Sequence, residues 1–409
     1  MPPPGRSRRA NRTRPHLGTE CPADARPFRT ILPAGRSAVI VGLFPELASA
    51  GGVQRAGRLT AAVLASFAAR RGQAWRFLSL NDPPQASPLR VGSQEIVFTG
   101  FRRSKLRFFH AAWNAARQRP SLVVALHPYL APVVAAMKLC APATRAVIFA
   151  HGVEVWTPLP FIRRRSLQLA DLVFAPSTDT ARQLAAQQGL HSEKVRRLPW
   201  SLGPEFDSAA PAGAGSQLPN GFPRGRVILT VGRWDAREAY KGVDHLILAM
   251  PRLLPAVPEL HLVAIGSGTD VPRLKRLAQQ SGVAARVHFL NSLPQEQLGP
   301  AYDSCDVFAL PSRGEGFGLV FLEAMSHGKP VVGGAHGGTP DVIDDGVTGY
   351  LVRYGDVPQL TDRLQRLLAE DTVRRNMGAR ALERVRRDFP FDRFSRDLAE
   401  ALETLSAAS

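Results

Sequence analysis

The sequence has little cysteine, few aromatic residues and no long apolar run, and these absences exclude several classes of protein. Its three cysteines, Cys21, Cys140 and Cys305, form no CxxC or Cys/His cluster, so we expect neither a disulfide framework nor a zinc site. No apolar run approaches the roughly 18 residues of a membrane-spanning helix. The Arg- and Pro-rich N-terminus lacks the apolar segment of a signal peptide. We therefore expect a cytoplasmic protein without a membrane anchor.

Acidic residues are scarce in the first half of the chain only. Residues 1–210 hold 29 Lys and Arg against 11 Asp and Glu, whereas residues 211–409 hold 23 of each kind. The whole formal net charge of +18 therefore comes from the first half. A basic half beside a neutral half predicts an anionic partner for the first half: membrane phospholipid, a lipid-phosphate acceptor or nucleic acid. A solvated basic face without a partner is the plain alternative.

The length of 409 residues favours two α/β domains with a cleft between them. A hydrophobic share of 44% and a charged share of 21% are those of a globular chain. The expected parts are a disordered basic tail (1–36), an N-terminal Rossmann-like domain (37–222), a C-terminal Rossmann-like domain (223–390) and a helix (391–409) that packs back on the first domain.

Short apolar runs alternate with helical stretches in both halves, which predicts parallel sheets built from βαβ units. The strands expected in the first half are Ala38–Phe44, Leu122–Leu126, Ala146–Ala150 and Leu172–Ala175, with helices at Val53–Arg70 and Thr180–Gln188. Those expected in the second half are Val227–Val231, His261–Ile265, Arg286–Leu290, Val307–Leu310 and Pro330–Val332, with helices at Val243–Leu254 and Leu319–Ser326. The segment 206–225, rich in Ala, Gly, Pro and Ser, predicts a hinge.

The string PSRGEGFGLVFLEAMSHGKPVV places two carboxylates, Glu315 and Glu323, on either side of a helix start. Gly316 and Gly318 allow a ligand to approach the backbone, and free amides at the helix start suit an anion or sugar hydroxyls. A carboxylate two turns along can accept hydrogen bonds from a vicinal diol such as a ribose. Taken singly, each glutamate is as easily a surface or turn residue; the combined string favours a site.

Two cations, Arg233 and Lys241, lie in the loop between a strand and a helix. Fixed cations there stabilise the negative charge that builds on a departing diphosphate. Near the N-terminus, Gly51-Gly52 follows the first strand and opens a helix, a type of loop that binds phosphate through backbone amides. No GxGxxG occurs at this position, which argues against a nicotinamide-dependent enzyme.

Several ordered motifs resemble those of family 4 retaining glycosyltransferases, which have the GT-B fold of two Rossmann-like domains facing a cleft and an E-x7-E signature. They are GGVQR at 51–55, HGVEVW at 151–156, VGRWDAREAYKGVDHL at 231–246, GSG at 266–268, the E-x7-E string and GGTPDVIDDGVTGYLV at 337–352. The resemblance extends over most of residues 38–390 and implies that the domain 37–222 binds the acceptor and the domain 223–390 binds the nucleotide-sugar donor.

This resemblance implies a role for each candidate residue. Glu315 would contact the donor sugar near its anomeric carbon, and Glu323 would hold the ribose hydroxyls. Arg233 and Lys241 would bind the diphosphate, His151 would lie beside the donor sugar, and Glu154 would face the acceptor. The catalytic set is thus Arg233, Lys241, Glu315 and His151. The remaining donor-binding residues implied are Gly51, Gly52, Gly266, Leu290, Gly316, Phe317, Gly318 and Leu319.

Three departures from the family pattern affect details. The AREAY segment lengthens the loop before Lys241, Asn291 replaces a glycine, and Asp341 replaces the glutamate of GG-x-P-E. The first leaves the place of the lysine open, and the other two bear on recognition of the base. The resemblance implies retention of the anomeric configuration. Because no residue is an obvious nucleophile and the recognised motifs lack an Asp-x-Asp, we expect a front-face displacement that needs no metal or other cofactor.

The function expected is transfer of a hexose-type sugar from a nucleotide diphosphate-sugar to a lipid-linked acceptor or a polysaccharide or glycolipid precursor. A sugar-nucleotide epimerase and a non-catalytic nucleotide-sugar-binding relative are the alternatives. A nucleic-acid-binding protein is disfavoured by 7% aromatic residues and no recognisable motif. The basic clusters 102–107 and 163–165 predict docking on anionic membrane, with Phe108 and Phe109 inserting at the interface; an ordinary amphipathic helix is the competing interpretation.

Overall fold

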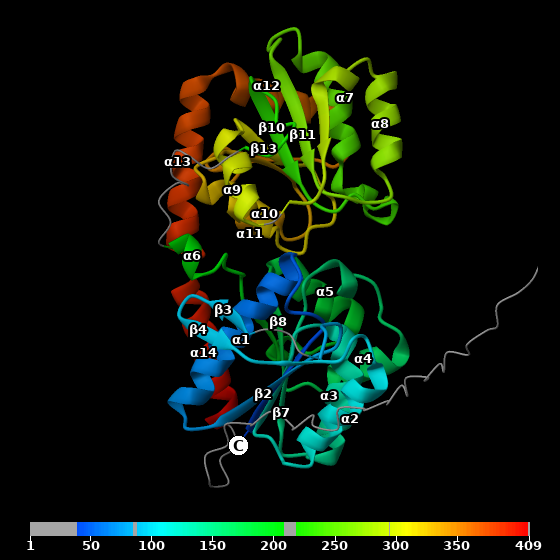
Figure 1. Cartoon of the computed structure of the whole chain (residues 1–409), viewed down its shortest axis with the longest axis vertical. Helices are drawn as coiled ribbons and strands as arrows, with labels where there is room; N and C mark the ends of the chain where they lie inside the picture. Colours follow the sequence, from blue (N-terminus) through cyan, green and yellow to red (C-terminus); the bar gives the residue numbers. More distant parts are fainter. Residues whose placement is uncertain (1–38, 85–87, 208–217, 294, 408–409) are drawn as a thin grey trace, which may run out of the picture. The chain divides into compact units, whose positions relative to one another are not determined.

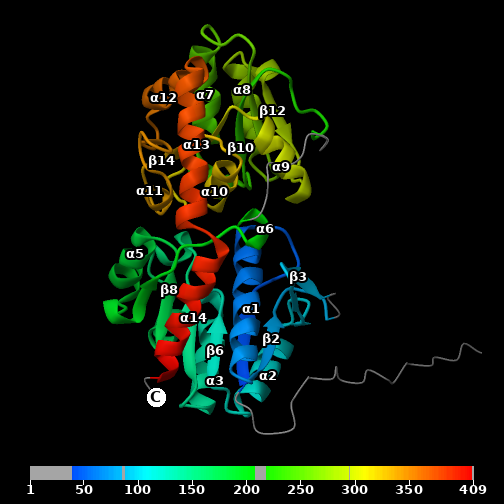
Figure 2. The ribbon, with the colours of Figure 1, turned by 90° about the vertical axis from the view of Figure 1, so that its left-hand side faces the viewer.

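The computed structural model describes residues 39–84, 88–207, 218–293 and 295–407. The expected N-terminal tail therefore lies outside the described residues, as does the middle of the expected hinge, residues 208–217. The described residues form two parallel sheets with helices on both faces, shown in Figures 1 and 2. Both sheets belong to one compact unit.

The first sheet has seven parallel strands in the order β5-β2-β1-β6-β7-β8-β9. They are β1 (Val39–Phe44), β2 (Ala74–Ser79), β5 (Thr99–Gly100), β6 (Leu122–Ala125), β7 (Arg145–Phe149), β8 (Leu172–Ala175) and β9 (Val195–Arg197). A short antiparallel hairpin of β3 (Leu89–Val91) and β4 (Gln94–Ile96) stands apart from this sheet. The strand order changes direction between β1 and β6, and ligands bind at such switch points in open parallel sheets.

Helices cover both faces of the first sheet. They are α1 (Gly52–Arg70), α2 (Lys105–Ala116), α3 (Ala131–Cys140), α4 (Phe161–Gln168), α5 (Thr178–Gln188) and α6 (Pro204–Asp207), with 3₁₀ turns η1 (Pro128–Leu130), η2 (Val153–Val155) and η3 (Ser192–Lys194). Helix α5 shows local stop and start signals: Ser177 Oγ accepts a hydrogen bond from the Thr180 amide at 3.2 Å, and Gly189 ends the helix in the left-handed conformation.

The second sheet has six parallel strands in the order β12-β11-β10-β13-β14-β15. They are β10 (Arg226–Val231), β11 (Leu260–Ile265), β12 (Val287–Leu290), β13 (Val307–Leu310), β14 (Val331–Gly334) and β15 (Gly349–Val352). The surrounding helices are α7 (Val243–Leu253), α8 (Val271–Gln280), α9 (Gln295–Ser304), α10 (Leu319–Ser326), α11 (Thr339–Val342), α12 (Val357–Ala369) and α13 (Asp371–Asp388), with η4 (Ala236–Lys241) and η5 (Ala284–Arg286). Its switch point lies between β10 and β13.

The last helix, α14 (Phe391–Ala407), begins after Phe389-Pro390 and packs against α1, as Figure 2 shows. Phe394 of this helix contacts the ring of Trp200 at 5.6 Å between centroids. The chain thus returns from the second sheet to the helices of the first. The exact domain boundaries expected from the sequence stay a prediction.

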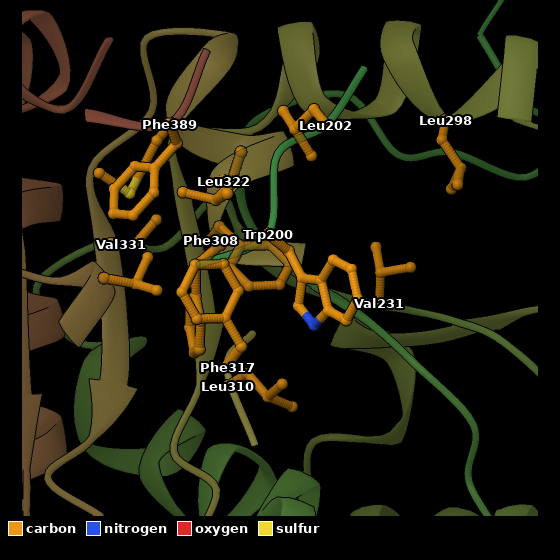
Figure 3. Close-up of a cluster of buried hydrophobic side chains, with 14 of the residues drawn as sticks. Trp200, Leu202, Val231, Leu298, Phe308, Leu310, Phe317, Leu322, Val331 and Phe389 are labelled. Carbon is orange, nitrogen blue, oxygen red and sulfur yellow. The ribbon is translucent and has the colours of Figure 1, made fainter. Parts of the chain in front are cut away.

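Alternate residues of β1 serve the two faces of the first sheet, as the two-residue period of a strand requires. Ile40 and Phe44 belong to the core that contains α1, whereas Val41 and Leu43 belong to a second core formed with α2 and α3. Side chains near the second sheet, among them Phe308, Phe317, Leu322 and Phe389, form the cluster shown in Figure 3 together with Trp200 and Leu202. The continuous apolar runs therefore belong to strands that are buried on both faces.

The expected strands and helices are confirmed, with bounds shifted by a few residues. Strands β8 and β13 and helix α10 have the predicted limits. Strands β2 and β9 were not predicted, because polar residues such as Arg76 and Arg196 interrupt their apolar runs. No bounds were predicted for β15 or for the short strands β3, β4 and β5 either. The sequence analysis also gave no bounds for α3, α4, α8, α9, α12 or α13.

The prediction that Phe108 inserts into a membrane is wrong, because its side chain is only 2% exposed and packs in the core beside Phe101. Phe109 is 43% exposed and Leu106, which the sequence analysis did not consider, is 84% exposed. The helix period places residues 106, 109 and 113 on the outer face of α2 and residues 108, 112 and 115 on its inner face. Within the described residues, no helix has the length and apolar character needed to cross a membrane.

We expect Phe108→Ala to lower the free energy of unfolding by about 3 to 5 kcal/mol, because it removes a buried aromatic ring and leaves a cavity. The matched variant Phe109→Ala should change the free energy of unfolding by less than about 1 kcal/mol, because much of that ring is in water. Urea unfolding of both variants measures the difference. Equal losses would contradict the assignment of the inner and outer faces of α2.

Candidate functional site

The candidate residues gather where strands of both sheets end. Gly51 follows β1, His151 follows β7, Arg233 follows β10, Gly266 follows β11 and the loop with Glu315 follows β13. All of these are carboxyl ends of parallel strands, and β1, β10 and β13 border the two switch points. The sequence thus places the functional side chains where open parallel sheets bind ligands.

A close backbone contact joins the loop after β13 to the loop after β7. A Cβ atom on Gly316 would lie 1.8 Å from the carbonyl oxygen of His151, and one on Gly152 would lie 2.3 Å from the Cα of Gly316. Only glycine can occupy both positions, since real Cβ atoms do not approach other atoms so closely. Gly316 therefore brings the Glu315 loop against His151, and two candidate residues from different sheets become neighbours.

Lys241 and Glu315 form an ion pair, with the lysine Nζ 3.3 Å from Glu315 Oε1. The same ammonium group lies 3.7 Å from Glu238, which also binds Arg233. The two cations therefore converge on one carboxylate, although the AREAY segment lengthens their loop. Lys241 is nearly buried, whereas the Arg233 side chain is 69% exposed and also pairs with Asp235 at 3.1 Å.

Tyr240, next to Lys241, was missed by the sequence analysis. Its ring packs on Gly314, because a Cβ atom there would lie 2.7 Å from the ring. Burial raises the pKa of the Tyr240 phenol. The charge of Lys241 lowers this pKa by a smaller amount, and the charges of Glu315 and Glu154 raise it. Glu154, which we expected on the acceptor side, thus acts on the same phenol as Glu315.

Glu323 is 7% exposed on α10, and protein groups bind both of its carboxylate oxygens. Arg55 Nη1 donates to Oε1 at 2.5 Å, and the Tyr302 hydroxyl donates to Oε2 at 2.7 Å. Burial, and then the neighbouring Glu323 charge, raise the pKa of Tyr302 well above its usual value, so this hydroxyl keeps its proton. The sequence contained Arg55 in the GGVQR motif, but nothing in its spacing indicated a partner 268 residues away.

The glycines of the site hold three strand ends together. A Cβ atom on Gly266 would lie 1.8 Å from the carbonyl oxygen of Gly232, and the Gly266 amide donates to the Leu290 carbonyl at 2.9 Å. A Cβ atom on Gly52 would lie 3.5 Å from Leu319 Cδ1, so the loop after β1 reaches the start of α10. Of the expected residues, Gly266 is thus next to Leu290, and Gly52 is next to Leu319.

Two further expected residues shape the start of α10. Gly318 precedes this helix with a φ of 100°, a conformation that favours glycine. The Phe317 side chain is buried and packs edge to face on Phe389 at 5.7 Å between centroids, which leaves its main chain for any contact with a donor. At the start of α1, Gly51 has a φ of 143° and its carbonyl accepts from the Arg55 amide at 2.9 Å.

Three contacts hold His151 in place. Its Nε2 lies 2.6 Å from the Leu126 carbonyl oxygen, which only accepts, so Nε2 is the hydrogen-bond donor. Its backbone amide donates to Glu154 Oε1 at 2.6 Å, and its ring stacks on Trp200 at 5.5 Å. Glu154 thus fixes the loop that presents the histidine.

A second histidine, His127, follows β6 and stacks on His151 at 5.6 Å between ring centroids. Its Nδ1 accepts from the Tyr129 amide at 3.0 Å, so the neutral ring carries its proton on Nε2. Burial, and then the charge of His151, lower the pKa of His127 to about 4. This residue was not predicted as part of the site, although its position directly after a buried strand indicates the carboxyl end of the sheet.

A cavity of about 300 Å³ shares Trp200 and Phe317 with this region but is a different environment. Its arginines pair with its own aspartates, among them Arg197 with Asp341 at 3.5 Å. Asp341, the residue that departs from the family pattern, also accepts from the Thr178 amide at 2.6 Å at the start of α5. Among the residues that the structure describes, no three His, Cys, Asp or Glu side chains are placed to hold a metal ion.

Comparisons with known proteins match both halves of the chain. The model of "Glycosyltransferase Family 4" matches residues 56–201, and that of "Glycosyl transferases group 1" matches residues 219–384. A GDP-mannose-dependent alpha-(1-6)-phosphatidylinositol monomannoside mannosyltransferase of Mycobacterium tuberculosis is 31% identical over 66% of this chain and 72% of its own length. The Mycolicibacterium smegmatis protein of the same name is 36% identical over 58% of this chain and 64% of its own length.

The Arabidopsis thaliana sulfoquinovosyl transferase SQD2 is 32% identical over 56% of this chain, and the match spans 43% of that protein. Among solved structures, Anabaena HepE in complex with UDP has a TM-score of 0.68 at 18% identity, covering 89% of this chain and 99% of its own. Sucrose-phosphate synthase of Thermosynechococcus elongatus has a TM-score of 0.70 at 23% identity, covering 90% and 100%. These likenesses confirm the GT-B fold.

We expect the low pKa of His127 to make the protein less stable in mild acid. The unfolded chain takes up a proton near pH 6.5, whereas the folded chain does so only near pH 4, so the contribution is complete above about pH 6.5 and is lost as pH falls toward 4. The loss is about 2 to 3 kcal/mol. His127→Asn is the matched variant, because its side-chain oxygen can still accept from the Tyr129 amide but does not titrate.

Urea unfolding at intervals between pH 4 and pH 7.5 measures this effect. The free energy of unfolding of His127→Asn should depend less steeply on pH than that of the parent. Identical pH dependences would mean that His127 takes up its proton equally easily in both states.

Proposed function

Because the chain belongs to glycosyltransferase family 4, we propose that it transfers a hexose-type sugar from a nucleotide diphosphate-sugar to an acceptor hydroxyl. The observation that carries this proposal is the convergence of Glu315, Lys241 and His151 at the carboxyl ends of two different sheets. An epimerase or a non-catalytic relative would use the same donor-binding residues, and only the reaction products distinguish them.

The donor is held, in this proposal, mainly by residues that follow the strands of the second sheet. Lys241 and Arg233 face the diphosphate, where their charges stabilise the leaving group as the bond to the anomeric carbon breaks. Both are now paired with carboxylates, so a bound diphosphate would take the place of Glu238 as their partner. Glu323 accepts from the ribose hydroxyls.

The transfer retains the configuration of the anomeric carbon. The bond from this carbon to the diphosphate oxygen breaks, the acceptor oxygen forms its bond on the same face, and its proton passes to the departing phosphate oxygen. We propose that Lys241 and Arg233 neutralise the charge of the diphosphate, as a divalent metal ion would otherwise do. His151 and Glu315 orient the sugar, and closure of the site excludes water that would hydrolyse the donor.

The acceptor side lies, in this proposal, near the carboxyl ends of β6 and β7. The guanidinium of Arg163 lies over the Tyr129 ring at 4.8 Å and the ammonium of Lys105 at 5.8 Å. Two cations beside one ring favour an acceptor that carries negative charge. The mycobacterial relatives are named for a phosphatidylinositol monomannoside acceptor, which supports a phosphate-bearing lipid acceptor here.

The acceptor would be presented by an anionic membrane on the cytoplasmic side, with the protein bound at the surface. Helices α2, α3 and α4 are neighbours and expose both apolar and basic side chains. We call this the α2–α4 surface; it comprises Leu106, Phe109, Trp113, Leu139, Phe161 and Ile162 with Arg102, Arg103, Lys105, Arg107 and Arg165. Exposed apolar side chains accompanied by cations are the composition of an interfacial membrane surface.

We expect the purified protein to form a glycoside product from one member of a panel of nucleotide diphosphate-sugars, and to keep this activity in excess chelator. Glu315→Gln should lower kcat by about 100-fold or more with little change in nucleotide affinity, because it weakens transition-state interactions. Glu323→Ala should weaken nucleotide binding itself. Normal kinetics of both variants would contradict the site assignment.

Two further outcomes decide between the candidate functions. An altered sugar nucleotide without any acceptor would identify an epimerase. Complete inhibition by chelator that a metal ion reverses would contradict the metal-free mechanism, while the transferase assignment would stand.

We expect binding to liposomes that contain anionic lipid, and a decrease of this binding as salt rises. Each basic residue contributes about 1 kcal/mol near such a surface, so Lys105→Gln with Arg107→Gln should lower the bound fraction in co-sedimentation. The matched control is Arg375→Gln with Arg386→Gln, which removes the same charge from exposed positions on α13. Equal recovery of the parent in the supernatant with neutral and anionic liposomes would contradict membrane docking.

A further inference from the structure

Arg55 is a buried cation for which the proposed mechanism gives no role. It lies in the first turn of α1, three residues after Gly52, and is only 6% exposed. Its guanidinium contacts Glu323 Oε1 at 2.5 Å on one side and lies over the Phe206 ring at 5.2 Å on the other. A charge in this position has a large desolvation cost unless its partners are well placed.

The hydrogen bonds of Glu323 leave it acceptor capacity for a diol while Arg55 is in place. A carboxylate has about four acceptor positions, and the groups that contact it here are Arg55 on one oxygen and Tyr302 on the other. Both partners donate, so the carboxylate is oriented from two sides and each oxygen keeps one acceptor position. Two neighbouring ribose hydroxyls can use these positions.

The charge of Arg55 is what keeps such a carboxylate useful as an acceptor. A buried carboxylate without a cation is expensive to maintain, and a protonated carboxyl accepts fewer hydrogen bonds. Arginine stays charged at any physiological pH, unlike lysine or histidine. Tyr302, whose raised pKa keeps it neutral, supplies a hydrogen bond but no charge.

We infer that Arg55 is a positioning residue for the ribose: it holds the Glu323 carboxylate in its orientation from the other half of the molecule. This inference rests on the proposed function, since it concerns the nucleotide of the donor. Arg55 acts through Glu323 rather than on the reacting atoms. Arg55 belongs to α1, which follows β1 of the first sheet, and Glu323 belongs to α10, which follows β13 of the second sheet. Affinity for the ribose therefore depends on helices from both halves of the molecule.

The test compares ribonucleotides with their 2′-deoxy forms, so that the ribose contact is measured separately from the rest of the nucleotide. Titration calorimetry with UDP, GDP and ADP first identifies the nucleotide that the parent binds. The parent should bind the ribonucleotide more tightly than its 2′-deoxy form. Arg55→Met should reduce this preference about 10-fold or more, the loss expected for a hydrogen bond to a charged group.

Three variants make the result specific. Arg55→Lys should restore part of the preference, because it keeps the charge but not the planar guanidinium. The double variant Arg55→Met with Glu323→Gln should show nearly the same preference as Glu323→Gln alone, because both substitutions act on the contact with the ribose. Arg70→Met is the matched control on the exposed end of the same helix and should leave the preference unchanged.

Each contrary outcome has a defined meaning. If Arg55→Met weakened binding of both nucleotide forms equally, Arg55 would serve the fold alone and the inference would be wrong. Tighter binding by Arg55→Met would show that Arg55 competes with the ribose, which also overturns the inference. If the parent bound none of the three nucleotides, the proposed function would fail together with the inference. If Arg55→Met kept the parent's preference for the ribonucleotide over its 2′-deoxy form, only the inference would be wrong.

Discussion

The close contact between Gly152 and Gly316 constrains the whole candidate site. A single methyl group on Gly316 would meet the His151 carbonyl at 1.8 Å, so the two loops can touch only through bare backbone. Glu315 and Gly318 flank this contact, and both are therefore placed by it. The positions of the acidic side chain, of the start of α10 and of the His151 ring all follow from an interaction in which no functional side chain takes part.

Paired charges are the second feature on which the site depends. Glu323 is neutralised by Arg55, Glu315 by Lys241, and the exposed Arg233 by Glu238. Exposed ion pairs contribute little to stability, and buried ones contribute little net stability because of the cost of desolvation. These pairs are therefore better explained by the fixed position that each gives to its charged groups than by their contribution to stability.

Most of the fold could be predicted from the sequence, because strands buried on both faces produce apolar runs that a reader can find. Strands with a polar residue in the middle, such as β2 with Arg76, do not produce that signal. Local spacing also predicted that Arg233 and Lys241 converge, since they share one loop. It could not predict the contact of Arg55 with Glu323, because contacts between distant segments are set by how the two sheets pack together.

The same limit applies to the outer surface of the first half. The sequence shows adjacent phenylalanines at 108 and 109, but only the helix phase, fixed by packing against β2 and α3, decides which one faces the core. The excess of basic residues in residues 1–210 has a structural counterpart in the exposed arginines of α2 and α4. Arg233 and Lys241 have carboxylate partners, whereas the cations around Tyr129 lie over an aromatic ring. An aromatic partner leaves the positive charge largely uncompensated, and this asymmetry is the physical basis of the anionic acceptor that we propose.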